Sequence, residues 1–133
     1  MRVEGGTAAE RRTFYTALYH ALIHPTVFED VNGEYLGRDQ LVHVARGYTR
    51  YTNVSGWDIY RTQIPLLALL APRVASDVAQ SLVAGAQEGG RLSRWSFASW
   101  EPGVMVGDPA DAILAGAYAF GARAFDTRAA LAE

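Results

Sequence analysis

Residues 51–61, with the sequence YTNVSGWDIYR, place an aromatic side chain beside a carboxylate where a loop meets a predicted helix. A flat indole such as that of Trp57 can stack on the C–H face of a sugar, while the neighbouring Asp58 accepts hydrogen bonds from sugar hydroxyls. The same segment also fits a structural role, because Ser55 and Asp58 have the spacing of a capping box, in which each side chain satisfies a free amide of the first helical turn. The residue types alone leave both interpretations open.

Glycosidic bond cleavage usually needs two carboxylates that flank the bond, one acting as acid and the other as base or nucleophile. Outside plain helix caps, the candidates in this chain are Asp58 and Glu101. Glu101 lies near Trp95 and Trp100, an apolar setting that would raise its pKa by desolvation. The alternative is an ordinary surface glutamate. The sequence therefore offers no complete acid and base pair, and we assign no catalytic residue.

The histidines and the short acidic segments do not match known metal motifs. His20 and His24 are four residues apart, but a zinc-binding helix with that spacing also carries a glutamate between the histidines, and here Ala21, Leu22 and Ile23 intervene. Residues 30–33, DVNG, partly match a calcium loop, yet the glycine comes too early and no glutamate closes the loop. We therefore interpret these residues as helix-end and turn residues and assign no metal ligand.

The composition describes one ordinary globular domain of 133 residues, half apolar, with twelve basic and fourteen acidic side chains. A net charge of −2 offers no basic surface for nucleic acid or an anionic membrane, so we expect neither partner. The chain has no cysteine, which excludes disulfides and thiolate zinc sites. We recognise no signal peptide in it and leave its compartment open.

Apolar periodicity and helix caps predict a mainly α chain. Thr7 and Glu10 form a predicted capping box at the first helix, and Pro65 is expected to kink or interrupt the second. The predicted helices span about residues 8–23, 58–71, 72–88 and 109–120, with a short fifth helix capped by Asp126. Residues 26–54 lose the helical period and carry turn signals, which predicts one or two short β-hairpins. Residues 91–107 are expected to form a shaped loop.

Two apolar surfaces of these helices are expected to need neighbours. Val74, Val78, Leu82 and Val83 form one stripe, and the leucines of residues 66–70 surround their helix on all sides. The fifth helix has only about two turns before the chain stops, which is marginal for an isolated helix. We therefore expect a partial domain over residues 1–133, and self-association if these surfaces lack their partners.

Several longer segments together resemble the family 92 glycoside hydrolases, which are exo-acting α-mannosidases. The segments occur in the family's order along essentially the whole chain, and FYTALYH together with YTN-x-SGWD is the most specific part. They are FYTALYH (14–20), HPTVFEDVNGEYLG (24–37), YTNVSGWDIYR (51–61), PLLALLAP (65–72), GGRLSRW (89–95) and VMVGDPADAILAGAYAFGARAFD (104–126).

The resemblance implies a fold, an activity and a binding role. Family members are several times longer, with an N-terminal β-sandwich followed by a toroid of paired helices of the (α/α)6 type, and this chain resembles the opening part of that toroid, formed of helical hairpins. They hydrolyse terminal α-mannosides, commonly α-1,2 linkages of N-glycan or mannan type, with inversion and with a bound calcium. The match to the SGWD element gives Trp57, Asp58 and Arg61 an implied substrate-contact role. A secreted or periplasmic parent enzyme is expected.

The resemblance is incomplete at two places. The family's general acid lies in a motif resembling EGNAWQY and its base in one resembling GNDD, and neither occurs in this chain. Residues 96–103, SFASWEPG, replace a passage that is more polar in the family. We therefore expect a piece of an α-mannosidase that is inactive alone. The alternative is a free-standing helical module that binds a glycan or a protein through Trp57, Trp95 and Trp100.

Overall fold

The computed structural model describes residues 1–132 and contains six helices and six short strands within that range. In chain order they are α1 (Ala8–Ala21), β1 (Thr26–Val27), β2 (Glu34–Leu36), β3 (Val42–Val44), β4 (Tyr51–Thr52), β5 (Val54–Ser55), α2 (Gly56–Ile59), α3 (Gln63–Leu70), α4 (Pro72–Gly89), β6 (Trp95–Ser96), α5 (Pro109–Ala119) and α6 (Thr127–Ala130). The predicted mainly α class is confirmed. None of the helices in residues 1–132 has both the length and the apolar character to cross a bilayer.

The hydrophobic core lies where α3, α4 and α5 pack together. The long helix α4 runs through the centre, and the predicted apolar stripe on it is buried: Val78, Leu82 and Val83 are almost inaccessible to solvent. Gly90, in the left-handed conformation, ends α4 as the sequence predicts. Of the two apolar surfaces that were expected to need neighbours, the stripe therefore finds its partners within this chain.

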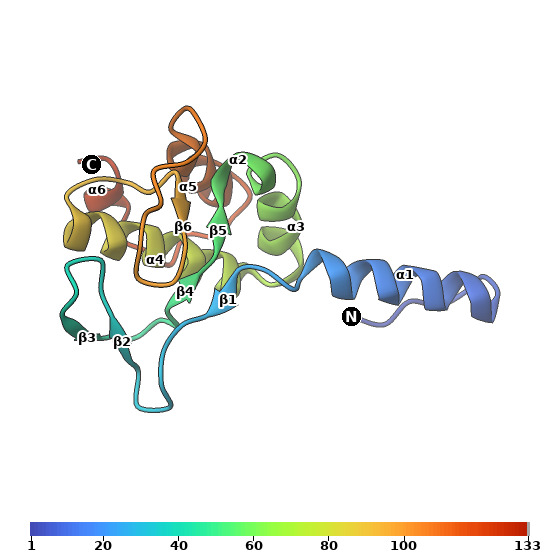
Figure 1. Cartoon of the computed structure of the whole chain (residues 1–133). Coiled ribbons are helices and arrows are strands. Elements are labelled where there is room, and N and C mark those ends of the chain that lie inside the picture. Colours follow the sequence, from blue (N-terminus) through green and yellow to red (C-terminus); the bar gives the residue numbers. More distant parts are fainter. Residues whose placement is uncertain (133) are drawn as a thin grey trace.

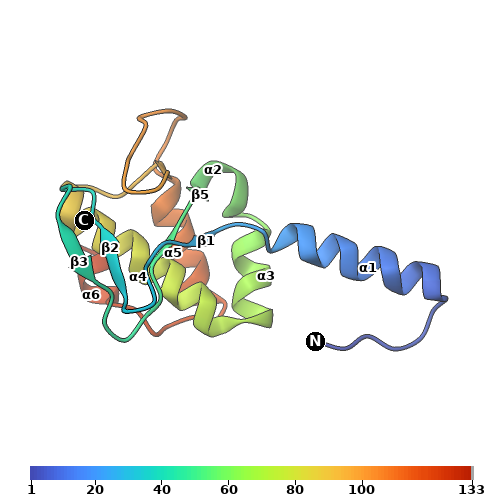
Figure 2. The same cartoon turned by 60° about the horizontal axis from the view of Figure 1, so that its bottom comes forward.

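Helix α1 projects away from this core in both views (Figures 1 and 2). Its capping box is confirmed, since the Thr7 amide donates to Glu10 Oε2 (2.7 Å) and the Glu10 amide donates to Thr7 Oγ1 (3.2 Å). None of the residues Ala8–Ala21 is buried. The helix ends two residues earlier than predicted, because the Leu22 amide turns back to the Tyr19 carbonyl in a tighter last turn. The bounds of α1 are therefore set by local capping, since none of its residues is buried.

The predicted second helix is two helices. The break falls at residues 60–62, before Pro65, which is the third residue of α3. A proline is tolerated there, because amides of the first turn have no partner within the helix. The leucines of α3 are also not buried on every side as predicted: Leu67 is buried, but Leu69 is 68% exposed. One side of α3 packs on the core, and the other faces solvent.

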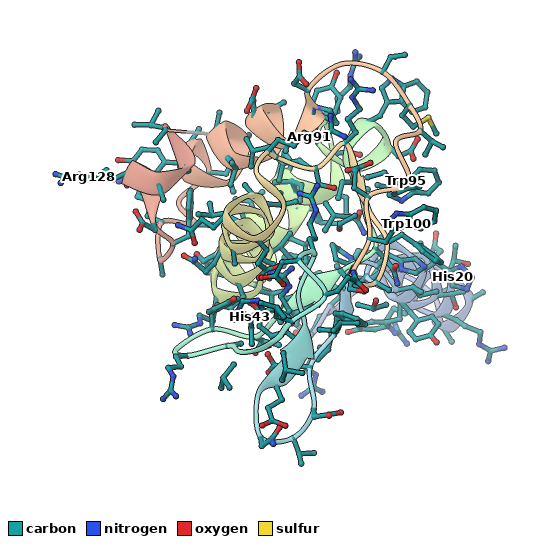
Figure 3. All side chains as sticks on the ribbon, turned by 60° about the vertical axis from the view of Figure 1, so that its left-hand side comes forward. His20, His43, Arg91, Trp95, Trp100 and Arg128 are labelled. Atoms are coloured by element: carbon teal, nitrogen blue, oxygen red, sulfur yellow. The ribbon has the colours of Figure 1, made fainter. Side chains whose placement is uncertain are left out.

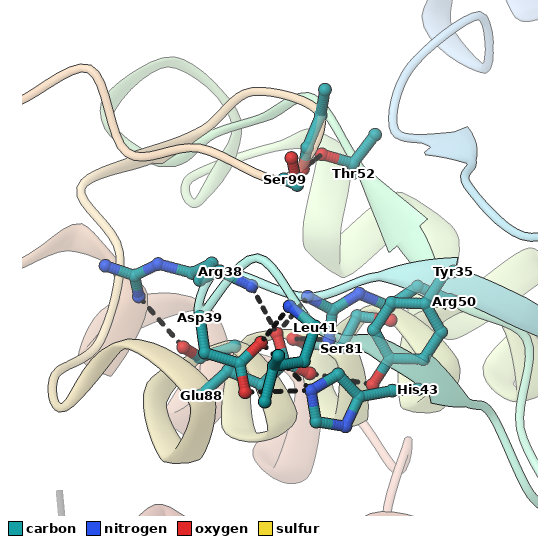
Figure 4. A network of polar contacts seen from close by, with 12 residues as sticks. Tyr35, Arg38, Asp39, Leu41, His43, Arg50, Thr52, Ser81, Glu88 and Ser99 are labelled. Carbon is teal, nitrogen blue, oxygen red and sulfur yellow. Dashed lines mark hydrogen bonds and ion pairs between the residues drawn. The ribbon is translucent and has the colours of Figure 1, made fainter.

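The predicted insertion at residues 26–54 holds one local hairpin, β2–β3, inside a wider pairing of β1 with β4. A buried polar network fastens the hairpin to the end of α4 (Figure 4). Glu88 accepts from the Tyr35 hydroxyl (2.7 Å) and the Arg38 amide (3.0 Å), and pairs with Arg50 (3.1 Å). Burial raises the pKa of Tyr35, so the phenol stays protonated and donates. The network holds β4, and so the segment that follows it, against the core.

Candidate functional site

The segment that carries Trp57 is fixed by two close contacts at the turn from β5 into α2. Strand β5 pairs with β6, with Ser55 opposite Trp95. Gly56 then passes so close to α5 that a Cβ atom would lie 2.6 Å from Pro109 Cγ and 2.8 Å from the Arg94 carbonyl oxygen. Only glycine fits this approach. Two segments distant in sequence, residues 94–96 and Pro109 of α5, therefore position the start of α2.

Ser55 and Asp58 do not form the predicted capping box. The Ser55 side chain makes no hydrogen bond to a helix amide; its hydroxyl instead donates to Asp58 Oδ2 (2.6 Å). Helix α2 has only four residues, and the Ser55 backbone is held in a strand pairing, which together displace the cap geometry. The hydroxyl therefore orients the Asp58 carboxylate, which stays exposed to solvent.

The structure places Trp57 and Arg61 next to this carboxylate in the chain, on α2 and just beyond it. Trp57 is 57% exposed, which leaves much of its indole accessible to a ligand. Arg61 is exposed, and its Nε donates to the Tyr60 hydroxyl (2.6 Å), with the guanidinium 5.2 Å from the centre of the Tyr60 ring. All three predicted site residues are thus exposed to solvent, in α2 or just beyond it.

Glu101, the other candidate acid, is a structural residue. Its carboxylate accepts from the Ser93 hydroxyl and from the amides of Arg94 (2.8 Å), Trp95 (3.3 Å) and Gly103 (3.0 Å). Burial by itself raises the pKa of Glu101, but these hydrogen bonds outweigh it and hold the pKa below its usual value. The predicted rise is therefore wrong. Glu101 stays ionised and closes the loop of residues 91–107.

A cavity of about 610 Å³ lies beside the start of α2, between the end of α1, the bend from β4 into β5 and the loop of residues 91–107. Ser55 forms part of its wall, so the cavity adjoins the residue that orients Asp58. Trp95 and Phe97 contribute aromatic surface, and Asn53, Gln63 and His24 contribute polar groups. Its volume is in the range of about 300–1,000 Å³ that is typical of small-ligand sites.

The described residues do not fit the calcium that the resemblance implies for the longer family members. No group of three or more His, Asp or Glu side chains within residues 1–132 is arranged to hold a metal ion. Glu101, Asp108 and Asp111 line one small hollow, but Arg91 and Arg94 share it, and Glu101 already accepts four hydrogen bonds. Calcium also prefers six to eight oxygen ligands. We derive no step of the chemistry through a metal ion.

Comparison with known proteins decides the family. All of residues 1–133 match the model of the glycosyl hydrolase family 92 catalytic domain. The chain belongs to glycosyl hydrolase family 92. The predicted family is thus confirmed, and no curated protein matches this GH92 chain.

Solved structures of family GH92 share the fold. One is an α-mannosidase of Bacteroides thetaiotaomicron, BT3965, in complex with mannoimidazole: 36% identity over 91% of this chain, with a TM-score of 0.86. Another structure of the same enzyme gives 34% identity over 96% of this chain and a TM-score of 0.90. The inverting mannosidase BT2199 of Bacteroides thetaiotaomicron VPI-5482 gives 34% identity over 98% of this chain and a TM-score of 0.84.

The GH92 chain corresponds to a small part of these enzymes, spanning only 16%, 18% and 18% of the lengths of the three solved chains.

Sequence reasoning did not find the cavity in this GH92 chain. Trp95 lies in the predicted loop of residues 91–107, but the sequence indicates no role at a cavity for Asn53 or Phe97. The only signal in the sequence was the asparagine at position 53. Asparagine tolerates the left-handed conformation better than most residues, and Asn53 adopts it here (φ 57°). A turn at that position brings β5 back towards residues 91–107. Only the three-dimensional structure shows that the two segments enclose a space.

Proposed function

We propose that this chain supplies the mannose-contact part of a GH92 exo-α-mannosidase and performs no hydrolysis alone. Trp57 would stack on the sugar ring, Asp58 would accept from its hydroxyls, and Arg61 would donate to a further oxygen. The proposed substrate is the terminal α-mannoside of an N-glycan or mannan, commonly α-1,2-linked, cleaved with inversion in the whole enzyme. Family membership and the exposed pair of Trp57 and Asp58 support this proposal.

The observation that carries it is the different state of the two candidate carboxylates. Asp58 is exposed and accepts one hydrogen bond, from Ser55, so its remaining lone pairs are available to a ligand. Glu101 is held ionised by four hydrogen bonds and cannot serve as the proton donor that glycoside hydrolysis requires. One free carboxylate supports binding, whereas cleavage needs a second.

The test separates binding from hydrolysis. The chain is titrated with methyl α-D-mannopyranoside by NMR and separately incubated with 4-nitrophenyl α-D-mannopyranoside. We expect saturable binding that Asp58→Ala weakens, and no release of nitrophenol. Release of nitrophenol at a rate that Asp58→Ala abolishes would show that the chemistry lies within these residues, and the proposal would be wrong.

The alternative, a free-standing glycan- or protein-binding module, is favoured by one observation. Trp57, Phe97 and Trp100 are all more than half exposed, which is unusual for large aromatic side chains. Submicromolar binding of a mannoside by the monomeric chain would favour this module. Millimolar binding, or binding by a self-associating chain, would favour the mannosidase part.

A further inference from the structure

Arg50 is a buried arginine that keeps one donor group without an acceptor. Its side chain is only 4% exposed. Nη1 donates to the Ser81 carbonyl (2.9 Å), and Nη2 donates to Glu88 Oε2 (3.1 Å). Nε is also buried, and within residues 1–132 it has no hydrogen-bond partner. Buried donors of this kind are almost always bonded to the protein or to an ordered water, because an unsatisfied donor is destabilising.

A small cavity of about 10 Å³ lies against Arg50, and we call it the inner cavity. A water molecule needs roughly 10–15 Å³ of such space, so the inner cavity has room for a single water and for nothing larger. Its lining is rich in short hydroxyl side chains and includes one glycine of α4. These residues are Thr52, Ser81, Gly85, Ser93 and Ser96.

Two of these hydroxyls keep the bonding capacity that a water molecule requires. Ser96 Oγ accepts from the Val54 amide (3.2 Å), and its proton can still be donated. The Ser93 hydroxyl donates to Glu101, and its oxygen can still accept. A water in the inner cavity would accept from Arg50 Nε and Ser96 and donate to Ser93. Three hydrogen bonds are typical of a buried water.

The charge at the inner cavity also favours a neutral ligand. The Arg50 guanidinium is paired with the Glu88 carboxylate, and both side chains are at most 6% exposed. The positive charge is therefore already compensated, and no anion is needed beside it. We propose that the inner cavity binds one internal water molecule, which joins Arg50 Nε to the loop of residues 91–107.

This water would fasten the segment before β4 to β6. Arg50 immediately precedes β4, and Ser96 of β6 lies opposite Val54 of β5. Figure 3 shows Trp95 and Trp100, which belong to the same loop as Ser96, on one side of the molecule. The water therefore helps to fix the base of the segment that carries both tryptophans. The inference goes beyond the proposed function and does not rest on it.

The test detects the water directly in the native chain, by ¹⁵N-edited NOESY and ROESY spectra recorded at the water resonance. The Arg50 Nε–H signal should show a cross peak to water with opposite signs in the two spectra, as expected for a water held longer than the tumbling time of the protein. The exposed Arg46 is the internal control, and its Nε–H signal should show only exchange peaks, which have the same sign in both spectra. An Arg50 signal with no cross peak, or with an exchange peak only, would overturn the inference.

A variant that fills the inner cavity gives the second measurement. Gly85→Ala adds a Cβ atom to its wall at ordinary contact distance, 3.4 Å from Arg38 Cδ and 3.5 Å from Arg50 Nη2, and alanine also favours the helix. The chain should therefore stay folded, and the Arg50 cross peak to water should disappear. The matched control is Gly116→Ala in α5, where a Cβ atom meets nothing within 4 Å, and the cross peak should be unchanged.

Two outcomes in these variants contradict the internal water. A cross peak that persists in Gly85→Ala would come from a serine or threonine hydroxyl proton that exchanges with solvent. A cross peak that disappears in Gly116→Ala as well would report a general disturbance of the fold. Either result would overturn the assignment of the water to the inner cavity.

Discussion

Asp58 follows β5 in the sequence, Glu101 follows β6, the strand that pairs with it, and the surroundings of the two carboxylates differ in one decisive way. Asp58 is exposed and accepts a hydrogen bond from one hydroxyl, whereas Glu101 accepts from a hydroxyl and three backbone amides. The residue whose lone pairs are occupied shapes a loop, and the residue whose lone pairs are free can bind a ligand. Apolar neighbours in the sequence suggested a raised pKa for Glu101, but hydrogen bonds from its own loop lower that pKa.

The largest expected effect is loss of mannoside affinity when the free carboxylate is removed. Hydrogen bonds to a charged group contribute about 1.5–3 kcal/mol, so Asp58→Asn should lower the affinity for methyl α-D-mannopyranoside by about tenfold or more. NMR titration measures the change. The matched control is Glu101→Gln, which neutralises the other carboxylate and should alter the monosaccharide affinity little. Equal losses in both variants would remove the distinction between the two residues.

For the free energy of unfolding, substitution of Glu101 should have the larger effect and substitution of Asp58 the smaller. Glu101→Ala leaves the buried Ser93 hydroxyl and several loop amides without their acceptor, which should cost about 1–3 kcal/mol of unfolding free energy. Asp58→Ala removes an exposed group and should change that free energy by less than about 0.5 kcal/mol. Urea unfolding followed by circular dichroism gives both values. A larger loss in Asp58→Ala than in Glu101→Ala would contradict this assignment of roles.

Part of the pH dependence of stability should come from Glu101. Its pKa in the folded chain lies below the ordinary value of 4.5, because its hydrogen bonds outweigh the effect of burial. The stabilisation is therefore complete above the unfolded pKa and is lost as the pH falls through the folded pKa. The difference in urea midpoint between the native chain and Glu101→Gln should be constant at neutral pH and shrink below about pH 4.5. A difference that grows on acidification would mean a raised pKa.

The smallest expected effect concerns the orientation of Asp58. Ser55→Ala removes the hydroxyl that orients Oδ2 but keeps the charged carboxylate that accepts from the sugar. Only part of the carboxylate's contribution to binding, about 0.5–1.5 kcal/mol, should then be lost, so mannoside affinity should fall about threefold to tenfold. Ser55→Thr keeps the hydroxyl and should restore most of the affinity. If neither variant changes binding, the Ser55 hydrogen bond does not position the carboxylate for the sugar.

Local signals in the sequence predicted the elements that depend on local physics. The Thr7 and Glu10 cap, the stripe of α4 and its glycine end are set by neighbours within a few residues, and all three are confirmed. The start of α2 and the bond from Ser55 to Asp58 depend on contacts with distant segments. Gly56 against Pro109, and Ser55 against Trp95, are such contacts. The periodicity and the residue spacing of the sequence do not reveal these long-range contacts.

The same limit applies to the candidate site. The resemblance to the family pointed to Trp57, Asp58 and Arg61, and the structure leaves all three exposed to solvent, in α2 or just beyond it. The resemblance could not predict the lowered pKa of Glu101, because the loop amides that bind its carboxylate converge only in the folded chain. The cavity also escaped prediction, since its walls come from α1, the β4–β5 bend and residues 91–107.

The most direct measurement is the response of the Trp57 indole N–H signal to methyl α-D-mannopyranoside in the native chain and in Asp58→Asn. Our account predicts a saturable shift of that signal in the native chain, and a titration at least about tenfold weaker in Asp58→Asn. An unmoved Trp57 signal at saturating sugar, or identical titrations of the two chains, would contradict the assignment of this pair as the mannose contact.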